Sequence, residues 1–401
     1  MIPFSPPKIT QEIIDEVVDS LKSGWITTGP KVKKLEDEVA KFSGVQHTVC
    51  LNSATAGLEL MLRWFGVKEG DEVIVPVYTY AATANVVVHC GATPVMVDCN
   101  SGDFNIDIEK IRAAITEKTK AIIPVDMAGM PCDYDALNKL VIESKNKFVA
   151  NSAEQKMLGR ILIISDAAHS FGGTLNGKRC GSLTDATAFS FHAVKNFTTA
   201  EGGAVCLNLP APFSNEEIAT SLRIKSLHGQ NKDALAKSKK GNWEYDIVEA
   251  GYKCNLTDVC AAIGLAEIKT YDSETLSRRK KIMEMYAAAF SKCSWAELPV
   301  FEDEKRKSSY HLYLLRIKNI SETQRNEIIQ KIFNRDVSVN VHFKPLPLLS
   351  FYKNAGCDIK NYPVAYDNYS REISLPVYFD LTDENVKTVI DAVVKSVEEV
   401  I

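Results

Sequence analysis

Seven short apolar runs, rich in valine, isoleucine and small residues, recur between positions 48 and 208 of the chain. Segments with the period of an amphipathic helix, such as TAGLELMLRWFG and NIDIEKIRAAI, lie between the first five runs. Near-continuous apolar strands that alternate with helices are typical of a mostly parallel sheet covered on both faces. The pattern therefore predicts an α/β domain. The runs are TVCLN, EVIVP, TPVMVD, AIIPV, ILIIS, ATAFS and GAVCLN.

The sequence pattern changes near Tyr271, where a long charged helical segment, DSETLSRRKKIMEMYAAAFSK, begins. The segments SSYHLYLLRI, ETQRNEIIQKIF, VSVNVHF and DENVKTVIDAVVKSVEEV follow it. Alternating strands and amphipathic helices of this kind predict a smaller α+β domain packed on the first. We place the large domain, with an N-terminal helical segment, at residues 1–270 and the small domain at 271–401. The polar stretch 143–160 is expected to be a surface excursion before the next strand.

Composition excludes several classes of partner. With 401 residues, 45% of them hydrophobic and 24% charged, the chain is typical of a globular protein. Its net charge of −4 gives no broad basic field for nucleic acid or an anionic membrane. The N-terminus lacks a signal-peptide core, and no apolar run reaches the roughly 18 residues of a membrane span. We expect a soluble, cytoplasmic protein without nucleic-acid or membrane partners.

Ten cysteines occur singly, mostly within apolar runs, and no C-x-x-C pair is present. This spacing signals neither a zinc ribbon nor a dithiol redox site. We expect reduced, buried thiols and no metal ion at the functional site.

Ligands of parallel α/β sheets bind at the carboxyl ends of the strands, so the residues after each run are the candidates for a site. The small and hydroxylated stretch NSATA, residues 52–56, follows the first run where a helix is expected to begin. Free N–H groups and the positive end of the helix dipole suit a phosphate there. A simple N-cap is the alternative interpretation of Ser53 or Thr55.

Two further strand ends carry residues that suit a planar cofactor. Tyr78 and Tyr80 follow the second run, where an aromatic ring could stack on a cofactor or merely pack the rim. Asp166 follows the apolar run ILIIS. A buried carboxylate is costly unless a group such as a protonated pyridine nitrogen pairs with it. An N-cap role for Asp166 is the alternative.

Lys195 lies between two strands, in the stretch SFHAVKNFTTAEGG that begins at Ser190. A lysine that forms a Schiff base must be held at a fixed place beside polar groups that ease proton transfer. A strand, a short turn and a glycine-rich return provide such a place. Together, the phosphate cradle, the aromatic ring, the acid and the later lysine predict a pyridoxal-phosphate enzyme of the aspartate-aminotransferase fold type, called fold type I.

The chain resembles the DegT/DnrJ/EryC1/StrS family of nucleotide-sugar aminotransferases over nearly its whole length. The stretches that carry the resemblance are SGWITTGPKVKKLE, NSATAGLEL, YTYAATANVV, GATPVMVD, SDAAHSFGG, SFHAVKNFTTAEGG and GYKCNLTDVCAAIGLAEI. WITTGP, FHAVKN and above all YKCNLTD are most similar to the branch that aminates C4 of UDP-4-keto sugars, as in the 4-amino-4-deoxyarabinose pathway.

The resemblance implies a role for each matched residue. Lys195 would bind the cofactor as a Schiff base and shuttle the proton, Asp166 would hold the pyridine nitrogen protonated, and His169 would lie near the phenolic oxygen. The remaining matched residues are Tyr80 for ring stacking, Ala54, Thr55 and Ser190 for the phosphate, Asn255 for the phosphate of the partner subunit, and Thr27, Thr28 and His342 for the sugar. Asn255 implies a homodimer with shared active sites.

Two positions depart from the pattern of many relatives. Ala54 stands where relatives often have glycine, which makes the approach of the backbone to the phosphate slightly less free. Asp126, in PVDMAG, stands where many relatives have histidine, so the contacts of that loop with substrate are open.

The resemblance implies a ping-pong transamination. L-Glutamate would load the cofactor with an amino group, and a keto-sugar nucleotide would receive it. Family members that act as dehydratases have histidine in place of the lysine, and Lys195 is present. A lyase or decarboxylase acting on an amino acid is the enzymatic alternative. A non-catalytic regulatory protein is the other alternative, although the acidic balance of the chain shows no basic recognition stripe.

Overall fold

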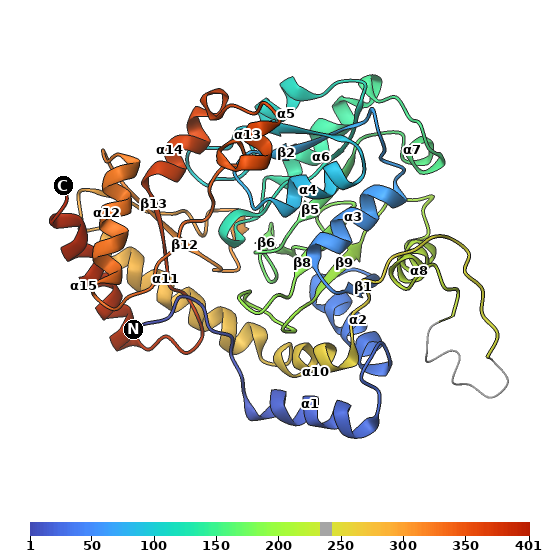
Figure 1. Cartoon of the computed structure of the whole chain (residues 1–401), viewed down its shortest axis with the longest axis horizontal. Coiled ribbons are helices and arrows are strands. Elements are labelled where there is room, and N and C mark those ends of the chain that lie inside the picture. Colours follow the sequence, from blue (N-terminus) through green and yellow to red (C-terminus); the bar gives the residue numbers. More distant parts are fainter. Residues whose placement is uncertain (233–242) are drawn as a thin grey trace.

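The computed structural model describes residues 1–232 and 243–401 of the chain. Its centre is a seven-stranded sheet in the order β1-β9-β8-β5-β4-β2-β3 (Figure 1). The strands are β1 (His47–Leu51), β2 (Glu72–Pro76), β3 (Thr93–Val97), β4 (Thr119–Ile122), β5 (Leu162–Asp166), β8 (Ala186–Ser190) and β9 (Gly203–Leu207). All seven coincide, within two or three residues at either end, with the apolar runs of the sequence.

The sheet is parallel except at one strand. β9 pairs antiparallel with both β1 and β8, and the other strands run in the same direction as one another. The glycine pair before β9 turns the chain back beside β8, with Ser190 opposite Gly203. The carboxyl ends of β1, β2, β4, β5 and β8 therefore meet at one edge of the sheet, which is where a ligand site is expected.

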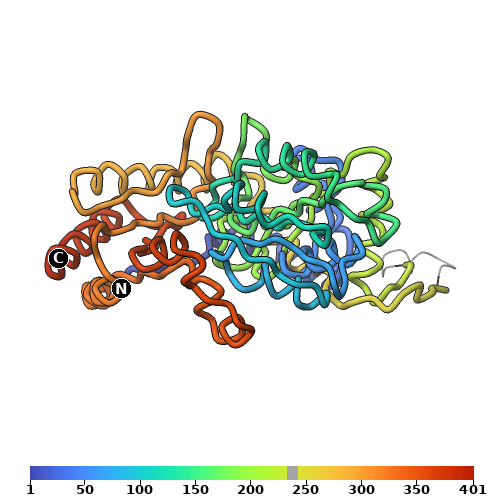
Figure 2. The backbone as a smooth tube through the Cα atoms, turned by 90° about the horizontal axis from the view of Figure 1, so that it is seen from above, coloured from blue at the N-terminus to red at the C-terminus, as the bar shows by residue number. Residues whose placement is uncertain are grey.

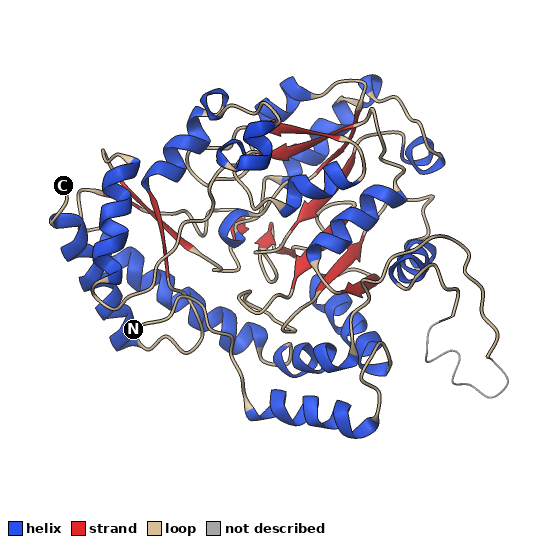
Figure 3. Cartoon of the chain, in the orientation of Figure 1, coloured by secondary structure: helices blue, strands red, loops and turns tan. Residues whose placement is uncertain are grey.

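Helices cover both faces of the sheet (Figure 3). One face packs against α3 (Ala54–Trp64), α4 (Ala82–His89) and α8 (Asn215–Ser226), and the other against α2 (Pro30–Ser43), α5 (Ile108–Ala114), α6 (Tyr134–Glu143) and α10 (Asp258–Glu267). Side chains of β1 alternate between these layers, because Val49 and Leu51 join the α3 side and Cys50 joins the α2 side. This three-layer arrangement buries near-continuous apolar strands, as the sequence predicts.

Helices α1 and α7 and two 3₁₀ turns also belong to the first 270 residues. Helix α1 (Gln11–Ser23) packs along α10, and its N-cap is Thr10, whose hydroxyl accepts a hydrogen bond from the Ile13 amide. The polar stretch after α6 forms the 3₁₀ turn η2 (Lys145–Lys147) and helix α7 (Ala153–Leu158) before the chain enters β5. A further 3₁₀ turn, η1 (Met127–Gly129), follows β4.

The C-terminal part is built on a second, three-stranded sheet, β10-β12-β13. Its strands are β10 (Ala296–Glu297), β12 (Tyr313–Ile317) and β13 (Glu372–Leu375). The helices are α11 (Ser277–Phe290), α12 (Glu322–Phe333), α13 (Ser350–Asn354), α14 (Pro363–Arg371) and α15 (Asp383–Glu398), with 3₁₀ turns η4 (Leu346–Leu348) and η5 (Ile359–Asn361). A small third sheet joins β11 (Arg306–Lys307) to β6 (Thr174–Leu175) and β7 (Lys178–Arg179).

One expectation for this part was wrong. The segment VSVNVHF is not a strand, because it makes only isolated bridges, from Val337 to Ile2 and from Asn340 to Ser374. The strand beside β12 is β13 instead, which follows α14 directly. The expected long helix after Tyr271 is present, but its first turns form a π-helix, η3 (Tyr271–Leu276), that continues into α11.

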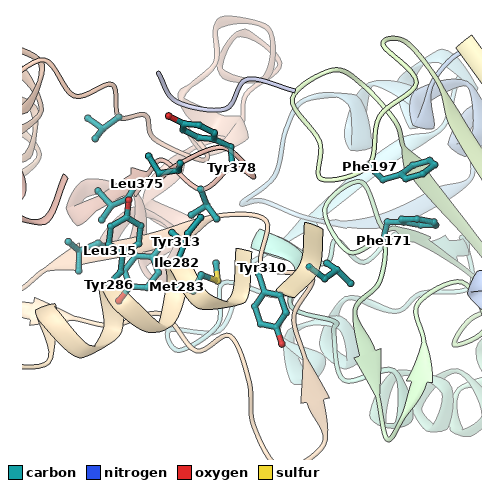
Figure 4. Close-up of a cluster of buried hydrophobic side chains, with 14 of the residues drawn as sticks. Phe171, Phe197, Ile282, Met283, Tyr286, Tyr310, Tyr313, Leu315, Leu375 and Tyr378 are labelled. Carbon is teal, nitrogen blue, oxygen red and sulfur yellow. The ribbon is translucent and has the colours of Figure 1, made fainter. Parts of the chain in front are cut away.

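A continuous apolar cluster links the two parts of the chain. Figure 4 shows Phe171 and Phe197 at one end of this cluster and Tyr286, Tyr313 and Leu375 at the other. Seen from above, the C-terminal helices extend the molecule away from the main sheet, and the N-terminus lies among them (Figure 2). The division of the chain at residue 270 remains a prediction.

The structure also bears on the cysteines and on membrane spans. All ten cysteines are free, and six of them are buried. Within residues 1–232 and 243–401, no helix has both the length and the apolar character needed to cross a bilayer.

Candidate active site

A cavity of about 440 Å³ lies at the carboxyl edge of the main sheet. Its floor comes from the residues that follow β2, β5 and β8 and from the first turn of α3. Segments of the C-terminal part close it, and residues 4–5 of the N-terminal segment also line it. Eight of the predicted site residues line this cavity: Ala54, Thr55, Tyr80, Asp166, His169, Ser190, Lys195 and His342.

Lys195 sits on a turn that is fixed on both sides. The side chain of its neighbour Asn196 donates to the Ser309 carbonyl oxygen at 2.6 Å and accepts from His311 Nδ1 at 2.7 Å. Further along, the Thr198 amide donates to the Glu267 carboxyl at 2.8 Å. Burial lowers the pKa of the Lys195 amine to about 8, against the attraction of Asp166. The amine is therefore available as a free base far more often than an ordinary lysine.

Asp166 is the last residue of β5 and is buried in the floor of the cavity. Its Oδ2 accepts a hydrogen bond from the Thr83 hydroxyl at 2.7 Å, and its Oδ1 accepts one from the Ala168 amide at 3.2 Å. Burial raises the pKa of Asp166, while these two donors and Lys195 oppose the shift. A cationic partner in the cavity would favour the ionised form and compensate its desolvation.

His169 lies one short turn beyond Asp166 and is also buried. Its ring contacts the His311 ring in a tilted arrangement, with 4.4 Å between the centroids, and its carbonyl oxygen accepts from the Ser309 hydroxyl. Burial and the nearby Lys195 lower the pKa of His169 well below the usual value, so the ring is neutral. Its Nδ1 is buried and makes no hydrogen bond with any described residue. A buried polar atom without a partner, on a residue that lines a cavity, suits a polar group of a ligand.

The first turn of α3 is shaped as an anion site. The Ser53 hydroxyl caps the helix by accepting from the Ala56 amide at 3.1 Å, so the N-cap interpretation of Ser53 is correct. The Ala54 and Thr55 amides precede that bond, where a helix offers no internal acceptor. Gly203 lets β9 approach this turn closely, because a Cβ there would lie 2.4 Å from the Ser53 carbonyl carbon. Helix dipole and free amides together favour a phosphate at this point.

Tyr80 and His342 line the cavity from opposite parts of the chain. Tyr80 follows β2, is 65% exposed, and its ring centroid lies 5.8 Å from that of Phe343. Tyr78, the other candidate, points elsewhere: it is fully buried and its hydroxyl donates to the His342 carbonyl oxygen at 2.8 Å. Of the two tyrosines, Tyr80 is the one placed to cover a ring in the cavity.

Three predicted residues lie outside the cavity of their own chain. Asn255 Nδ2 donates to the Thr28 hydroxyl at 2.6 Å, and that hydroxyl donates to the Leu256 carbonyl oxygen at 2.6 Å. Thr27 adjoins this cluster, where its carbonyl oxygen accepts from the Asp258 amide at 2.9 Å. Thr27, Thr28 and Asn255 therefore share one surface region that does not line the cavity.

Asp126 does not take the place of a ligand-contacting histidine. It is fully buried and accepts hydrogen bonds from the Tyr134 and Ser170 hydroxyls at 2.5 Å each and from the Cys132 amide at 2.9 Å. Burial raises its pKa to about 6. Ser170 directly follows His169. By accepting from the Ser170 hydroxyl, Asp126 therefore supports the turn that carries Asp166 and His169.

Sequence reasoning did not single out three neighbours of the catalytic candidates. The Thr83 hydroxyl donates to Asp166, the His311 ring contacts His169 at a tilt, and Phe4 stacks on His342 with centroids 5.4 Å apart. Thr83 lies within the matched stretch YTYAATANVV, which is the signal in the sequence that points to it. His311 and Phe4 are far from the site in sequence, and only tertiary packing brings them to it.

The cavity fits pyridoxal phosphate by its own chemistry. It offers a lysine amine with a lowered pKa, a buried carboxyl for a protonated ring nitrogen, an unpartnered imidazole nitrogen for a phenolic oxygen, and a helix N-terminus for a phosphate. These four groups converge from separate elements on one space.

Comparisons with known proteins agree with this chemistry. The structure of Spr1654 from Streptococcus pneumoniae, solved in its PMP form, is 50% identical, covers all of both chains and superposes with a TM-score of 0.97. Its PLP form gives a TM-score of 0.95 at 48% identity, covering 100% of this chain and 99% of that one. PseC from Helicobacter pylori, an aminotransferase involved in the biosynthesis of pseudoaminic acid, is 28% identical over 99% of both chains, with a TM-score of 0.86.

The sequence comparisons point the same way. The spore coat polysaccharide biosynthesis protein SpsC of Bacillus subtilis is 38% identical over 98% of this chain and 96% of its own length. The model of the DegT/DnrJ/EryC1/StrS aminotransferase family matches residues 7–394. Fold type I and the cofactor, pyridoxal phosphate, are thereby confirmed. The chain belongs to the DegT/DnrJ/EryC1/StrS aminotransferase family.

Proposed function

We propose that this protein transfers an amino group from L-glutamate to a keto-sugar nucleotide in a ping-pong reaction. The observation that carries the proposal is the convergence of Lys195, Asp166 and His169 on one cavity at the carboxyl edge of the sheet. The sugar acceptor is supported by the relatives, since Spr1654 is named as a sugar aminotransferase and SpsC is named for polysaccharide biosynthesis. A place in amino-sugar or surface polysaccharide biosynthesis follows from the same likeness.

The residues of the chain have distinct tasks in this proposal. Bound pyridoxal phosphate supplies an electron sink that stabilises negative charge at the substrate carbon. The Lys195 amine carries the proton to and from that carbon, and with a pKa of about 8 roughly a tenth of it is neutral at pH 7. Asp166 keeps the ring nitrogen protonated, and Tyr80 covers the ring. The amides of Ala54 and Thr55 and the Ser190 hydroxyl hold the phosphate.

We propose further that the working unit is a homodimer with shared active sites. Asn255 lies outside the cavity of its own chain and would reach the phosphate of the partner's cofactor. Large apolar side chains of the segment that leads to Asn255 are exposed, among them Trp243 at 77% and Val248 at 56%. Exposed apolar groups gathered on one segment suit a subunit interface. Thr27, Thr28 and His342 are proposed to contact the sugar nucleotide.

The acceptor is tested with a panel of UDP-, dTDP- and GDP-linked keto sugars, each offered to enzyme preloaded by glutamate. We expect amination of a UDP-4-keto sugar at C4, seen as return of the bound cofactor from the pyridoxamine to the pyridoxal form by absorbance and as an amino sugar by mass spectrometry. Turnover with an amino acid alone, yielding carbon dioxide or a cleaved side chain, would instead favour the lyase or decarboxylase alternative.

A further inference from the structure

A chain of hydrogen bonds connects the cavity to a buried acid on the second sheet. His342 lines the cavity, and its Nδ1 lies 2.9 Å from the Ser374 hydroxyl oxygen. Ser374 Oγ lies 2.5 Å from Glu372 Oε1, and Glu372 Oε2 accepts from the His342 backbone amide at 3.1 Å. Glu372 and Ser374 are two residues apart on β13, so their side chains lie on the same face of the strand.

Glu372 is a buried carboxyl without an ion-pair partner among the described residues. Its side chain is fully buried, and its hydrogen-bond donors are the Ser374 hydroxyl and the His342 amide. Nearby arginines point their donors elsewhere: Arg325 donates to the Glu372 and Tyr369 carbonyl oxygens, and Arg316 pairs with Glu297. Burial therefore raises the pKa of Glu372 to about 8.

His342, at the other end, resists becoming a cation. Burial and the nearby Lys195 lower its pKa to about 4. The neutral rings of His169 and His311 also face this region, and Tyr78 donates to the His342 carbonyl oxygen. An imidazole in this position cannot act as a base by itself near neutral pH, because the positive charge would be left beside Lys195.

The hydrogen-bond directions offer another route. When Glu372 is ionised, it accepts from Ser374, so Ser374 must accept from His342 Nδ1–H, and Nε2 presents a lone pair. When Glu372 carries a proton on Oε1, it donates to Ser374, Ser374 donates to Nδ1, and the hydrogen of the ring is on Nε2. Within the described part of the chain, Nε2 makes no hydrogen bond, and the ring lines the cavity.

We propose that His342, Ser374 and Glu372 form a proton relay that opens into the cavity. A proton taken up at His342 Nε2 is balanced by transfer of the Nδ1 proton to Ser374 Oγ and of the Ser374 hydroxyl proton to Glu372 Oε1. The imidazole stays neutral throughout, and Glu372 gains the proton. The reverse sequence delivers a proton from Nε2. All three residues of the relay come from one chain. Only the transfer of the proton between His342 Nε2 and an oxygen of the bound acceptor rests on the proposed function.

The test is the tautomer of His342, read by ¹⁵N NMR of histidine-labelled protein between pH 6 and 10, with and without cofactor. The protonated and bare nitrogens of a neutral imidazole give well separated signals, and a His342→Asn variant assigns them. We expect the hydrogen to lie on Nε2 at low pH and to move to Nδ1 with a midpoint near pH 8. A single tautomer across the whole range would overturn the relay.

Three variants separate the relay from a general structural effect. Glu372→Gln imitates the protonated acid and should hold the hydrogen on Nε2 at every pH, and Ser374→Ala should abolish the interchange. Glu36→Gln is the control, because Glu36 is another buried acid whose pKa burial raises, and its partners are Arg223 and the Cys50 amide. It should titrate like the wild type. A wild-type interchange in Glu372→Gln or in Ser374→Ala would contradict the proposal.

The outcome is independent of the proposed reaction. If glutamate fails to convert the cofactor while the interchange of His342 is seen, the function is wrong and the relay stands. If glutamate converts the cofactor and His342 keeps one tautomer, the relay is wrong and the function stands.

Discussion

The carboxyl of Asp166 depends on a single hydroxyl for much of its stabilisation. Thr83 Oγ1 donates to it at 2.7 Å, and the Thr79 hydroxyl lies 2.9 Å from Thr83 in turn. A hydrogen bond to a charged group contributes about 1.5–3 kcal/mol. The protonation state of Asp166, and with it that of the cofactor nitrogen, is therefore sensitive to this neighbour.

We expect Thr83→Val to raise the pKa of Asp166 further and to lower kcat on the order of tenfold, the equivalent of about 1.4 kcal/mol. Thr83→Ser keeps the hydroxyl and should retain activity near that of the wild type. Steady-state kinetics of both variants provide the measurement. Equal losses in the two would show that activity does not follow the hydroxyl and would contradict the role of this hydrogen bond.

The site residues that the sequence predicts are those whose chemistry is unusual for their position. An acid at the end of an apolar run and a lysine between a strand and a glycine pair stand out without any coordinates, and Asp166 and Lys195 do line one cavity. The sequence could not predict His311 and Glu372 as site residues, because neither is an unusual residue type in its own segment. They are recognised as site residues only because folding places His311 beside His169 and Glu372 beside His342.

At the scale of elements, the phosphate site depends on close packing between β9 and α3. A Cβ on Gly203 would lie 2.4 Å from the Ser53 carbonyl carbon and 2.5 Å from the Ala54 nitrogen. Both are backbone atoms that cannot move without displacing the first turn of α3. A glycine is therefore required at position 203 for steric reasons, and the sequence alone could not show this requirement.

Gly203→Ala should weaken cofactor binding about tenfold or more and cost about 1–3 kcal/mol of unfolding free energy through overpacking. Gly102→Ala is the matched control, since a Cβ there meets nothing within 4 Å and its φ is not positive. Cofactor titration followed by absorbance and thermal unfolding measure the two effects. If Gly203→Ala binds the cofactor as Gly102→Ala does, the close approach has no role in the phosphate site.

The strands of the main sheet were predictable because burial on both faces makes each of them, except the partly exposed edge strand β3, a continuous apolar run. Strand β13 was not, since EISL carries the buried Glu372 and Ser374 that serve the relay. Conversely, VSVNVHF alternates like a strand but makes only isolated bridges. β13 departs from the local pattern because it carries the relay residues, and VSVNVHF departs from it because the end of this segment lines the cavity.

For the whole molecule, buried acids set a pH dependence of stability. Burial raises the pKa of Glu267 from 4.5 to about 8. A carboxyl whose pKa is higher in the folded state stabilises the fold fully below the unfolded pKa and loses this contribution as pH rises through the folded one. The free energy of unfolding should therefore fall between about pH 4.5 and 8.

Glu267→Gln removes this titration while its amide oxygen can still accept from Thr198. Denaturant unfolding between pH 5 and 8 should show the wild type losing stability relative to the variant, by up to about 1.4 kcal/mol per pH unit. A constant difference between the two proteins across this range would show that Glu267 has the same pKa folded and unfolded.

The shared active site can be tested by mixing subunits. Lys195→Ala should be inactive, and Asn255→Ala should bind the cofactor weakly. A hybrid dimer contains one site with Lys195 from one chain and Asn255 from the other, so mixing after unfolding and refolding should raise activity above that of either variant. No gain on mixing, with hybrids shown by mass spectrometry, would place Asn255 in its own chain's site or in none.

The most direct test of the central claim is the absorbance spectrum of the protein with pyridoxal phosphate, before and after L-glutamate, beside Lys195→Ala. The wild type should show the band of cofactor bound to lysine, and glutamate should convert it to the pyridoxamine form. The variant should lack that band and complete no turnover. A wild type that binds no cofactor, or whose bound cofactor responds to no amino donor, would contradict the assignment of Lys195 and its cavity as a transaminase site.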